Sequence, residues 1–227
     1  MKSDTDLEKI KNFIENIDSI STLENSLGNY KNAVLICIDA VLSINRKYYK
    51  FVVPRITYFQ DNYPNITTLH QLLNLIEEKG IDGFSECWNY KHDERVEILH
   101  NLVIKLIEIS KRYNENTEIG NLKLWAKETL PSDYKNFNVK GIGLATFQYI
   151  RMLLGASTVK PDVHIKRTIS NVLNRKVSDI EAINLFEQAC KELNLDVAVI
   201  DHNLWLLLAN DAYDFPMIWK DNKWILK

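Results

Sequence analysis

Glycine and proline are scarce in this sequence, with seven glycines and five prolines among 227 residues. A sandwich or barrel built from short strands usually needs more of both residues at its tight turns. The chain also shows no convincing pair of strands, no repeat of fixed period and no low-complexity linker. These absences favour long helices joined by short loops, so we predict an all-α fold.

Cysteine is also rare. Its three occurrences, Cys37, Cys87 and Cys190, are widely spaced and odd in number. Such a set makes neither a disulfide framework nor a thiolate metal site. We expect three free thiols, buried or half-buried in the core.

Long apolar runs are missing. One of the longest, Ala33–Ile38, spans six residues, whereas a helix that crosses a membrane needs about 20. The N-terminal segment Met1–Glu8 is polar and charged, unlike a signal peptide. We therefore expect a cytoplasmic monomer without a membrane segment, associated with the nucleoid if the host is prokaryotic.

Charge changes sign along the chain, although the net charge is only −2. The basic block, residues 135–176, holds eight basic residues and one acid, Asp162, a net +7. Residues 178–214 hold one basic residue and eight acids, a net −7. An oriented field that attracts phosphates to one face would follow, with Lys140 and Arg151 among the phosphate contacts. Ordinary solvated helix faces explain the pattern equally well.

Apolar residues recur at helical spacing over most of the chain. Ser178 and Glu181 have the spacing of a capping box, and Gly80 has the character of a helix stop. The helices predicted from this spacing are Leu7–Ile17, Asn32–Leu42, one capped by Thr67 or Thr68 and stopped by Gly80, His92–Arg112, Leu122–Leu130, Leu144–Leu154, one opened by Lys160–Asp162, Ser178–Leu193 and Ile200–Ala212.

A Gly-x-Gly turn, Gly141-Ile142-Gly143, stands between a short helix end and the helix that starts at Leu144. We call the segment Phe137–Thr146 the hairpin. The two glycines allow positive φ and a close approach of another backbone. Amides in the first turn of the Leu144 helix lack partners and can donate to a phosphate. A plain connection between two helices would show the same turn.

A second motif, Val159-Lys160-Pro161-Asp162-Val163-His164-Ile165-Lys166-Arg167, begins 17 residues after Ile142. Together the two motifs resemble the paired signature of the helix-hairpin-helix DNA glycosylase superfamily. That superfamily contains endonuclease III, the adenine glycosylase that acts opposite oxidised guanine, and the alkyl-base glycosylases.

Two further stretches carry the resemblance. Leu42–Asn45 resembles the family's Leu-Ser-x-Gln, which supplies a side chain that wedges into the duplex. Asn45 is shorter than glutamine, so Arg46 or another residue has to help fill the gap. Asp201–Trp205 resembles the acid-to-tryptophan stretch of a late helix.

The resemblance implies an enzyme of base excision repair, a DNA N-glycosylase, with Asp162 at its catalytic centre. Base excision passes through a cation-like sugar, which a carboxylate can stabilise while it activates water. The first turn of a helix also favours an anion by about 0.3–1 kcal/mol. Simple capping of that helix is the alternative reason for an aspartate at this position.

The same resemblance implies a partner, duplex DNA that contains one damaged or modified base. The residues expected at the DNA are Asn45, Arg46, Lys140, Gly141, Ile142, Gly143, Leu144, Ala145, Lys160, His164 and Lys166. A flipped base needs an aromatic pocket, for which the candidates are Tyr48, Tyr49, Trp88, Tyr90 and Trp125, although we expect most of these side chains to lie in the core.

The sequence departs from the family in two places. Relatives that also cut the strand carry a lysine where this chain has Ala145, so we expect a monofunctional enzyme that uses water. No cysteine follows Trp205, so no iron–sulfur cluster is expected, and no other cofactor. A structural monovalent cation could bind the carbonyls of Val139, Gly141 and Ile142, where water would serve equally well.

We predict a two-lobed glycosylase fold. Residues 32–159 form one lobe that ends with the hairpin, and residues 1–31 plus 160–227 form the other, with DNA across the cleft. Two alternatives remain open. One is a helix-hairpin-helix DNA-binding protein without catalytic activity, and the other is a helical adaptor whose basic block meets an acidic partner.

Overall fold

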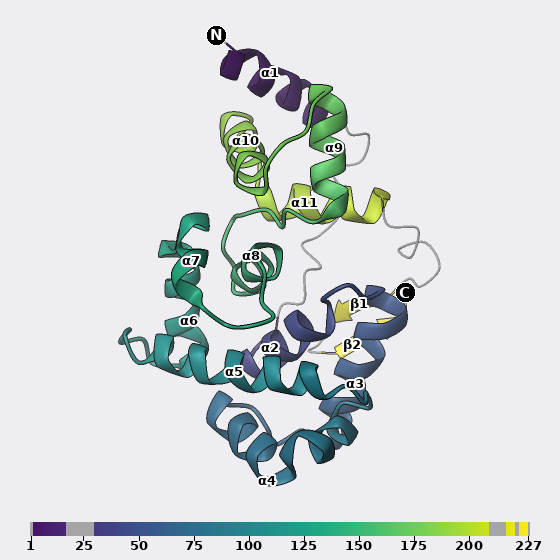
Figure 1. Cartoon of the computed structure of the whole chain (residues 1–227), viewed down its shortest axis with the longest axis vertical. Helices are drawn as coiled ribbons and strands as arrows, with labels where there is room; N and C mark the ends of the chain where they lie inside the picture. The colour runs from purple at the N-terminus through teal and green to yellow at the C-terminus, as the bar shows by residue number, and fades with distance from the viewer. Residues whose placement is uncertain (1, 17–29, 209–216, 221–222, 227) are drawn as a thin grey trace.

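The computed structural model describes residues 2–16, 30–208, 217–220 and 223–226, and helices dominate it (Figure 1). The all-α class is therefore confirmed. The helices are α1 (Lys2–Glu15), α2 (Ala33–Leu42), the π-helix η1 (Tyr48–Val52), α3 (Val53–Asn62), α4 (Leu69–Cys87), α5 (Asp93–Ser110), α6 (Glu118–Glu128), the 3-10 helix η2 (Pro131–Asp133), α7 (Tyr134–Phe137), α8 (Leu144–Leu153), α9 (Val163–Leu173), α10 (Asp179–Glu192) and α11 (Val197–Leu208).

Polar caps set several helix starts. Thr68 forms a capping box with Gln71 at α4, and Ser178 forms the predicted one with Glu181 at α10. Gly80 was predicted to end its helix, and the backbone does leave the helical conformation there, with a ψ of 173°. Its φ of 66° kinks α4, but the chain resumes the helix and buries Phe84 beyond the kink.

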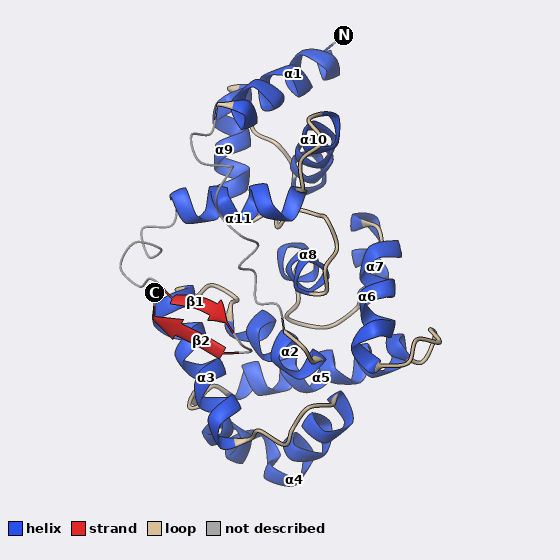
Figure 2. Ribbon diagram, turned by 180° about the vertical axis from the view of Figure 1, so that it is seen from behind, coloured by secondary structure: helices blue, strands red, loops and turns tan. Residues whose placement is uncertain are grey.

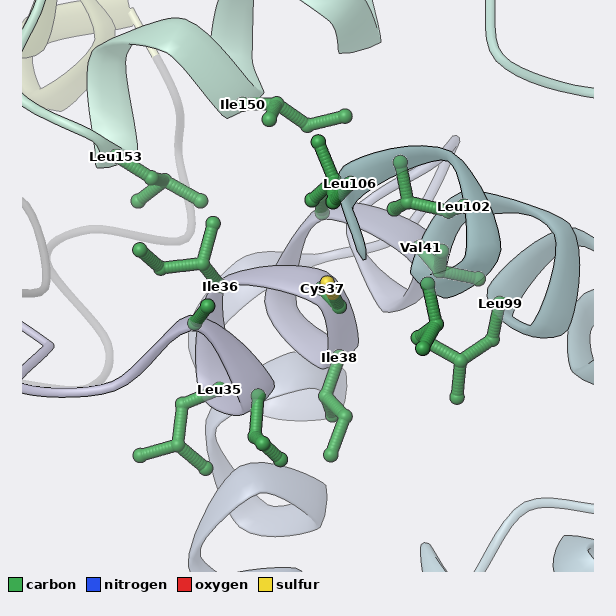
Figure 3. Packing of buried hydrophobic residues seen from close by; sticks show 14 of the residues in the cluster. Leu35, Ile36, Cys37, Ile38, Val41, Leu99, Leu102, Leu106, Ile150 and Leu153 are labelled. Carbon is green, nitrogen blue, oxygen red and sulfur yellow. The ribbon is translucent and has the colours of Figure 1, made fainter. Parts of the chain in front are cut away.

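Two hydrophobic clusters form the interior. The larger surrounds α2, whose ten residues are all buried. Figure 3 shows Ile36, Cys37 and their neighbours on α2 facing Leu99, Leu102 and Leu106 of α5 and Ile150 and Leu153 of α8. The smaller cluster joins α1, α9, α10 and α11. The predicted lobes have nearly the same membership, although the division at residue 159 stays a prediction.

Residues near the C-terminus form an antiparallel strand pair that the sequence analysis did not predict. Strand β1 (Met217–Lys220) pairs with β2 (Lys223–Leu226), with Met217 opposite Leu226. Strand β2 lies against α3, on the side of the first predicted lobe rather than the second (Figure 2).

The three cysteines are free and buried, as predicted. Among the described residues, no helix has both the length and the apolar character needed to cross a membrane.

The hairpin depends on one of its two glycines. Gly141 has a φ of 86°, and a Cβ added there would lie 2.4 Å from Ile98 Cδ1. Gly143 has an ordinary φ of −85° and open space around it, so only the first glycine needs the positive φ expected of both. The first-turn amides of any helix lack an intrahelical acceptor. Gly143 has no side chain to cap those of α8, so they have no capping acceptor either.

We expect Gly141→Ala to lower the free energy of unfolding by about 1–3 kcal/mol, because the new methyl group meets Ile98 and the backbone is strained. Gly143→Ala is the matched control and should change stability by less than about 1 kcal/mol. Urea unfolding of both variants tests this. Equal destabilisation by the two substitutions would contradict the conclusion that only Gly141 needs to be a glycine.

Candidate functional site

Three segments that are distant in sequence meet at one cleft of about 890 Å³. They are the loop after α2, the N-terminus of α8 and the turn that leads into α9. In Figure 1, α8 lies between α2 and the group formed by α9, α10 and α11. The predicted site residues that line the cleft are Asn45, Arg46, Gly143, Leu144, Ala145, Lys160, Asp162, His164 and Lys166.

The other predicted hairpin residues lie elsewhere. Lys140 and Ile142 line a second hollow, of about 730 Å³, together with Lys105 and Lys135. The Ile142 side chain is buried, and its amide donates to the Val139 carbonyl at 3.1 Å. The hairpin therefore lies between two hollows. Lys140 and Ile142 line one of them, and the residues from Gly143 onward line the cleft.

Asp162 is the N-cap of α9. Its Oδ1 accepts hydrogen bonds from the amides of His164, at 2.8 Å, and Ile165, at 3.1 Å. Its own amide donates to the Lys160 carbonyl at 2.7 Å. Both cap bonds use one carboxylate oxygen, so the cap leaves the second oxygen for a ligand in the cleft.

A second carboxylate, Asp201, lies behind this turn on α11. Burial raises its pKa well above the ordinary value of 3.8, and the charge of Asp162 raises it further. The charge of Lys160 and a hydrogen bond from its backbone act in the opposite direction. Within the described part of the chain, Asp201 Oδ1 has no hydrogen-bond partner. Burial in this position therefore favours the neutral acid.

The basic block divides into groups with different surroundings. Lys160, Lys166, Arg167 and Lys176 line the cleft. Arg175 is paired with Asp6 at 2.7 Å and Glu181 at 2.6 Å.

Arg151, predicted to contact phosphate, is instead buried. Its guanidinium donates to the carbonyls of Ala126 and Thr129 and to Gln148 Oε1. That part of the charge prediction is wrong, because Arg151 is buried and each of its three guanidinium nitrogens already donates to an acceptor inside the protein.

The loop after α2 presents Asn45 at its exposed tip, with a φ of 54°. Arg46 is restrained beside it, because its Nη2 donates to Tyr90 Oη at 2.8 Å and its guanidinium lies 5.4 Å from the centre of the Phe51 ring. Both residues are exposed, and the side chain of Arg46 is the one that these contacts hold in place.

None of the five aromatic candidates for a base pocket lines the cleft. Trp88, Trp125 and Tyr49 are buried in the core, and Tyr48 and Tyr90 are half-buried without lining the cleft.

The aromatic residues that do line the cleft are Tyr149 and Trp205. Tyr149 follows Ala145 by one helical turn, so the spacing could have revealed that both share a face of α8. Trp205 contacts the edge of Tyr48 at 5.9 Å and stacks on His202 at 6.1 Å. Burial lowers the pKa of His202 to about 4, so its imidazole is neutral.

A buried carboxylate, Asp39 of α2, supports the cleft floor. Its Oδ2 accepts hydrogen bonds from the hydroxyls of Tyr30, at 2.6 Å, and Tyr48, at 2.8 Å. Its Oδ1 accepts from Ser43, at 2.8 Å, and Tyr149, at 3.0 Å. Burial raises the pKa of Asp39, and the four hydroxyls oppose that rise.

This cluster was not predicted, although an aspartate inside the otherwise apolar helix α2 was a visible signal in the sequence. Because Ser43 and Tyr149 also line the cleft, the cluster fixes part of its floor.

Comparison with known proteins identifies a family. The profile of DUF8548, described as a domain of unknown function, matches residues 8–208, so the chain belongs to that family. No curated protein and no solved structure matches the chain.

The buried Asp201 gives a pH-dependent prediction. An aspartate whose pKa is raised by folding stabilises the folded state fully when the pH is below 3.8, the ordinary pKa of the group. This stabilisation is lost as the pH rises toward the pKa of the folded state. Asp201→Asn removes this titration. The variant should therefore gain stability relative to the parent above about pH 4, by up to about 1.4 kcal/mol per pH unit. Urea unfolding over a pH series measures the difference in free energy of unfolding between the variant and the parent. A difference that does not change with pH would contradict a pKa raised by burial.

Proposed function

We propose that this member of the DUF8548 family is a monofunctional DNA glycosylase that hydrolyses the N-glycosidic bond of a damaged or modified base. One observation carries the proposal: Asp162, the uncapped start of α8 and the loop at Asn45 line the same cleft. A carboxylate, a group of phosphate-binding amides and a wedge are what base excision requires, and they come from three separate parts of the sequence.

The start of α8 suits a DNA phosphate. The first-turn amides at Leu144 and Ala145 lack intrahelical acceptors, and the helix dipole adds positive potential at this end. The exposed cations Arg167 and Lys176 line the same cleft. Contacts of this kind hold the DNA backbone without reading its sequence.

The surroundings of Asp162 suit a hydrolytic reaction. A carboxylate held at a helix N-terminus stabilises a cation-like sugar and can take a proton from the attacking water. Ala145 provides no amine for a Schiff base at the position where relatives of the resembled superfamily carry lysine. Trp205 is the aromatic side chain of the cleft that suits a flipped base, since Lys160 already lies over the ring of Tyr149.

The proposal requires no cofactor. A monovalent cation at the carbonyls of Val139 and Gly141 stays a prediction, as does a monomeric state.

A DNA-binding protein without catalysis is the second candidate. It is favoured by the two cap bonds to Asp162 Oδ1, since capping alone would account for an aspartate at this position. The two candidates differ in what the charge of Asp162 does.

Asp162→Asn separates them. Asparagine caps helices about as well as aspartate, so stability should change little. The loss of charge should slow single-turnover base release about a thousandfold, which corresponds to ~4 kcal/mol of transition-state stabilisation. Binding to the duplex should survive, because a charge that repels phosphates has been removed.

The matched control is Asp179→Asn, which removes another acid that lines the cleft and pairs with Lys166 at 2.9 Å. It should change the rate of base release far less. A folded Asp162→Asn protein that releases base at the parental rate would leave only the capping role.

A further inference from the structure

One lysine in the cleft is held in an unusual way. Lys160 Nζ lies 4.1 Å from the centre of the Tyr149 ring, and both residues line the cleft. No carboxylate among the described residues forms an ion pair with Lys160. An aromatic face therefore positions this ammonium group without an ion pair to a described residue.

The Tyr149 ring is itself held in place by a hydrogen bond to a buried residue. Tyr149 is 7% exposed, and its hydroxyl donates to the buried Asp39, which also accepts from Ser43 and Tyr48. A phenol bonded to a carboxylate cannot rotate its hydroxyl toward the cleft without losing that bond. The face that Tyr149 offers to Lys160 is thereby set by contacts inside the protein.

Lys160 also shares a tight turn with the proposed catalytic residue. The Asp162 amide donates to the Lys160 carbonyl, and the buried Pro161 between them fixes the backbone. The turn thus brings one anion and one cation to the same cleft.

The other cations of the cleft have different surroundings. Lys166 is paired with Asp179, Arg46 is bonded to Tyr90, and Arg167 and Lys176 are exposed. Lys160 is half-buried, and its charge acts on the buried Asp201. It therefore lies nearer the interior than cations placed to meet a phosphate backbone.

Cleavage of an N-glycosidic bond creates charge of both signs. The electron pair of the C1′–N bond leaves with the base, and the sugar becomes cationic. Water then adds to C1′ and gives up a proton, which ends on the departed base through Asp162 or solvent. A site with a carboxylate alone would stabilise only the sugar half of this transition state.

We propose that Lys160 is a further catalytic residue, whose ammonium stabilises the negative charge that the departing base carries away. Tyr149 and Asp39 are its positioning residues. The inference rests on the proposed function, and it adds a residue that stabilises the leaving group of the same reaction. A fixed, partly desolvated cation is effective here because it needs no reorganisation as the charge develops.

The test compares two bases in one duplex sequence. The first is a base that the parent protein releases, and the second is the same base with an electron-withdrawing substituent, which departs more easily. Lys160→Met should slow single-turnover release of the first base on the order of a hundredfold. It should slow release of the second base much less, since that base needs less help to leave.

Three further variants refine the test. Lys176→Met, an exposed lysine of the same cleft, should reduce both rates by the same factor. Lys160→Arg keeps the charge and should restore most of the rate, which excludes misfolding as the cause. Tyr149→Phe keeps the ring but loses the bond to Asp39, so it should lower the melting temperature. At temperatures where it stays folded, it should show a weaker form of the Lys160→Met pattern.

Equal losses for the two bases in Lys160→Met would overturn the inference and indicate a phosphate contact. So would weaker binding of Lys160→Met to a duplex with a tetrahydrofuran abasic site, which has no base to contact. If the parent protein releases no base from any duplex, the proposed function itself fails, and the inference falls with it.

Discussion

The hydrogen bonds to the buried carboxylate of Asp39 are the constraint on which the cleft depends. A carboxylate without solvent is costly unless donors surround it, and here four hydroxyls do so. They come from the segment before α2, the loop after α2, the π-helix and α8. Loss of one donor would leave a buried charge less satisfied, so these segments are coupled to one another.

This coupling links the interior of the larger cluster to the candidate site. Ser43 begins the loop that carries Asn45, and Tyr149 supports Lys160 two residues before Asp162. The wedge candidate and the turn into α9 are therefore held by one buried anion. The proposed chemistry needs this rigidity, since a small displacement of a catalytic group can cost a large factor in rate.

Local features were predictable from the sequence, and non-local ones were not. Apolar spacing and capping residues such as Ser178 act within a few residues, so most helices and the hairpin were anticipated. The hydrogen bond from Tyr149 to Asp39 joins residues 110 positions apart, and no local pattern reports it.

The same reason explains the errors in the predicted site. Arg151 was predicted to be a surface cation. Its carbonyl acceptors lie 22 and 25 residues earlier in the chain, so no local pattern indicates that it is buried. Most aromatic candidates for the pocket were expected to be core residues, but only the packing of α4 and α6 shows that Trp88 and Trp125 are among them. By contrast, Asp162 and the start of α8 reached the same cleft as expected, because each lies at a helix terminus that its own motif defines.

The most direct test of the central claim is release of free base by the parent protein from a panel of duplexes. Each duplex carries one damaged or modified base, and the strand is examined before and after alkali. The account predicts release of one class of base, with a strand that stays intact until alkali is added. Salt-dependent binding without release from any duplex would contradict the enzymatic claim and leave a protein that only binds DNA.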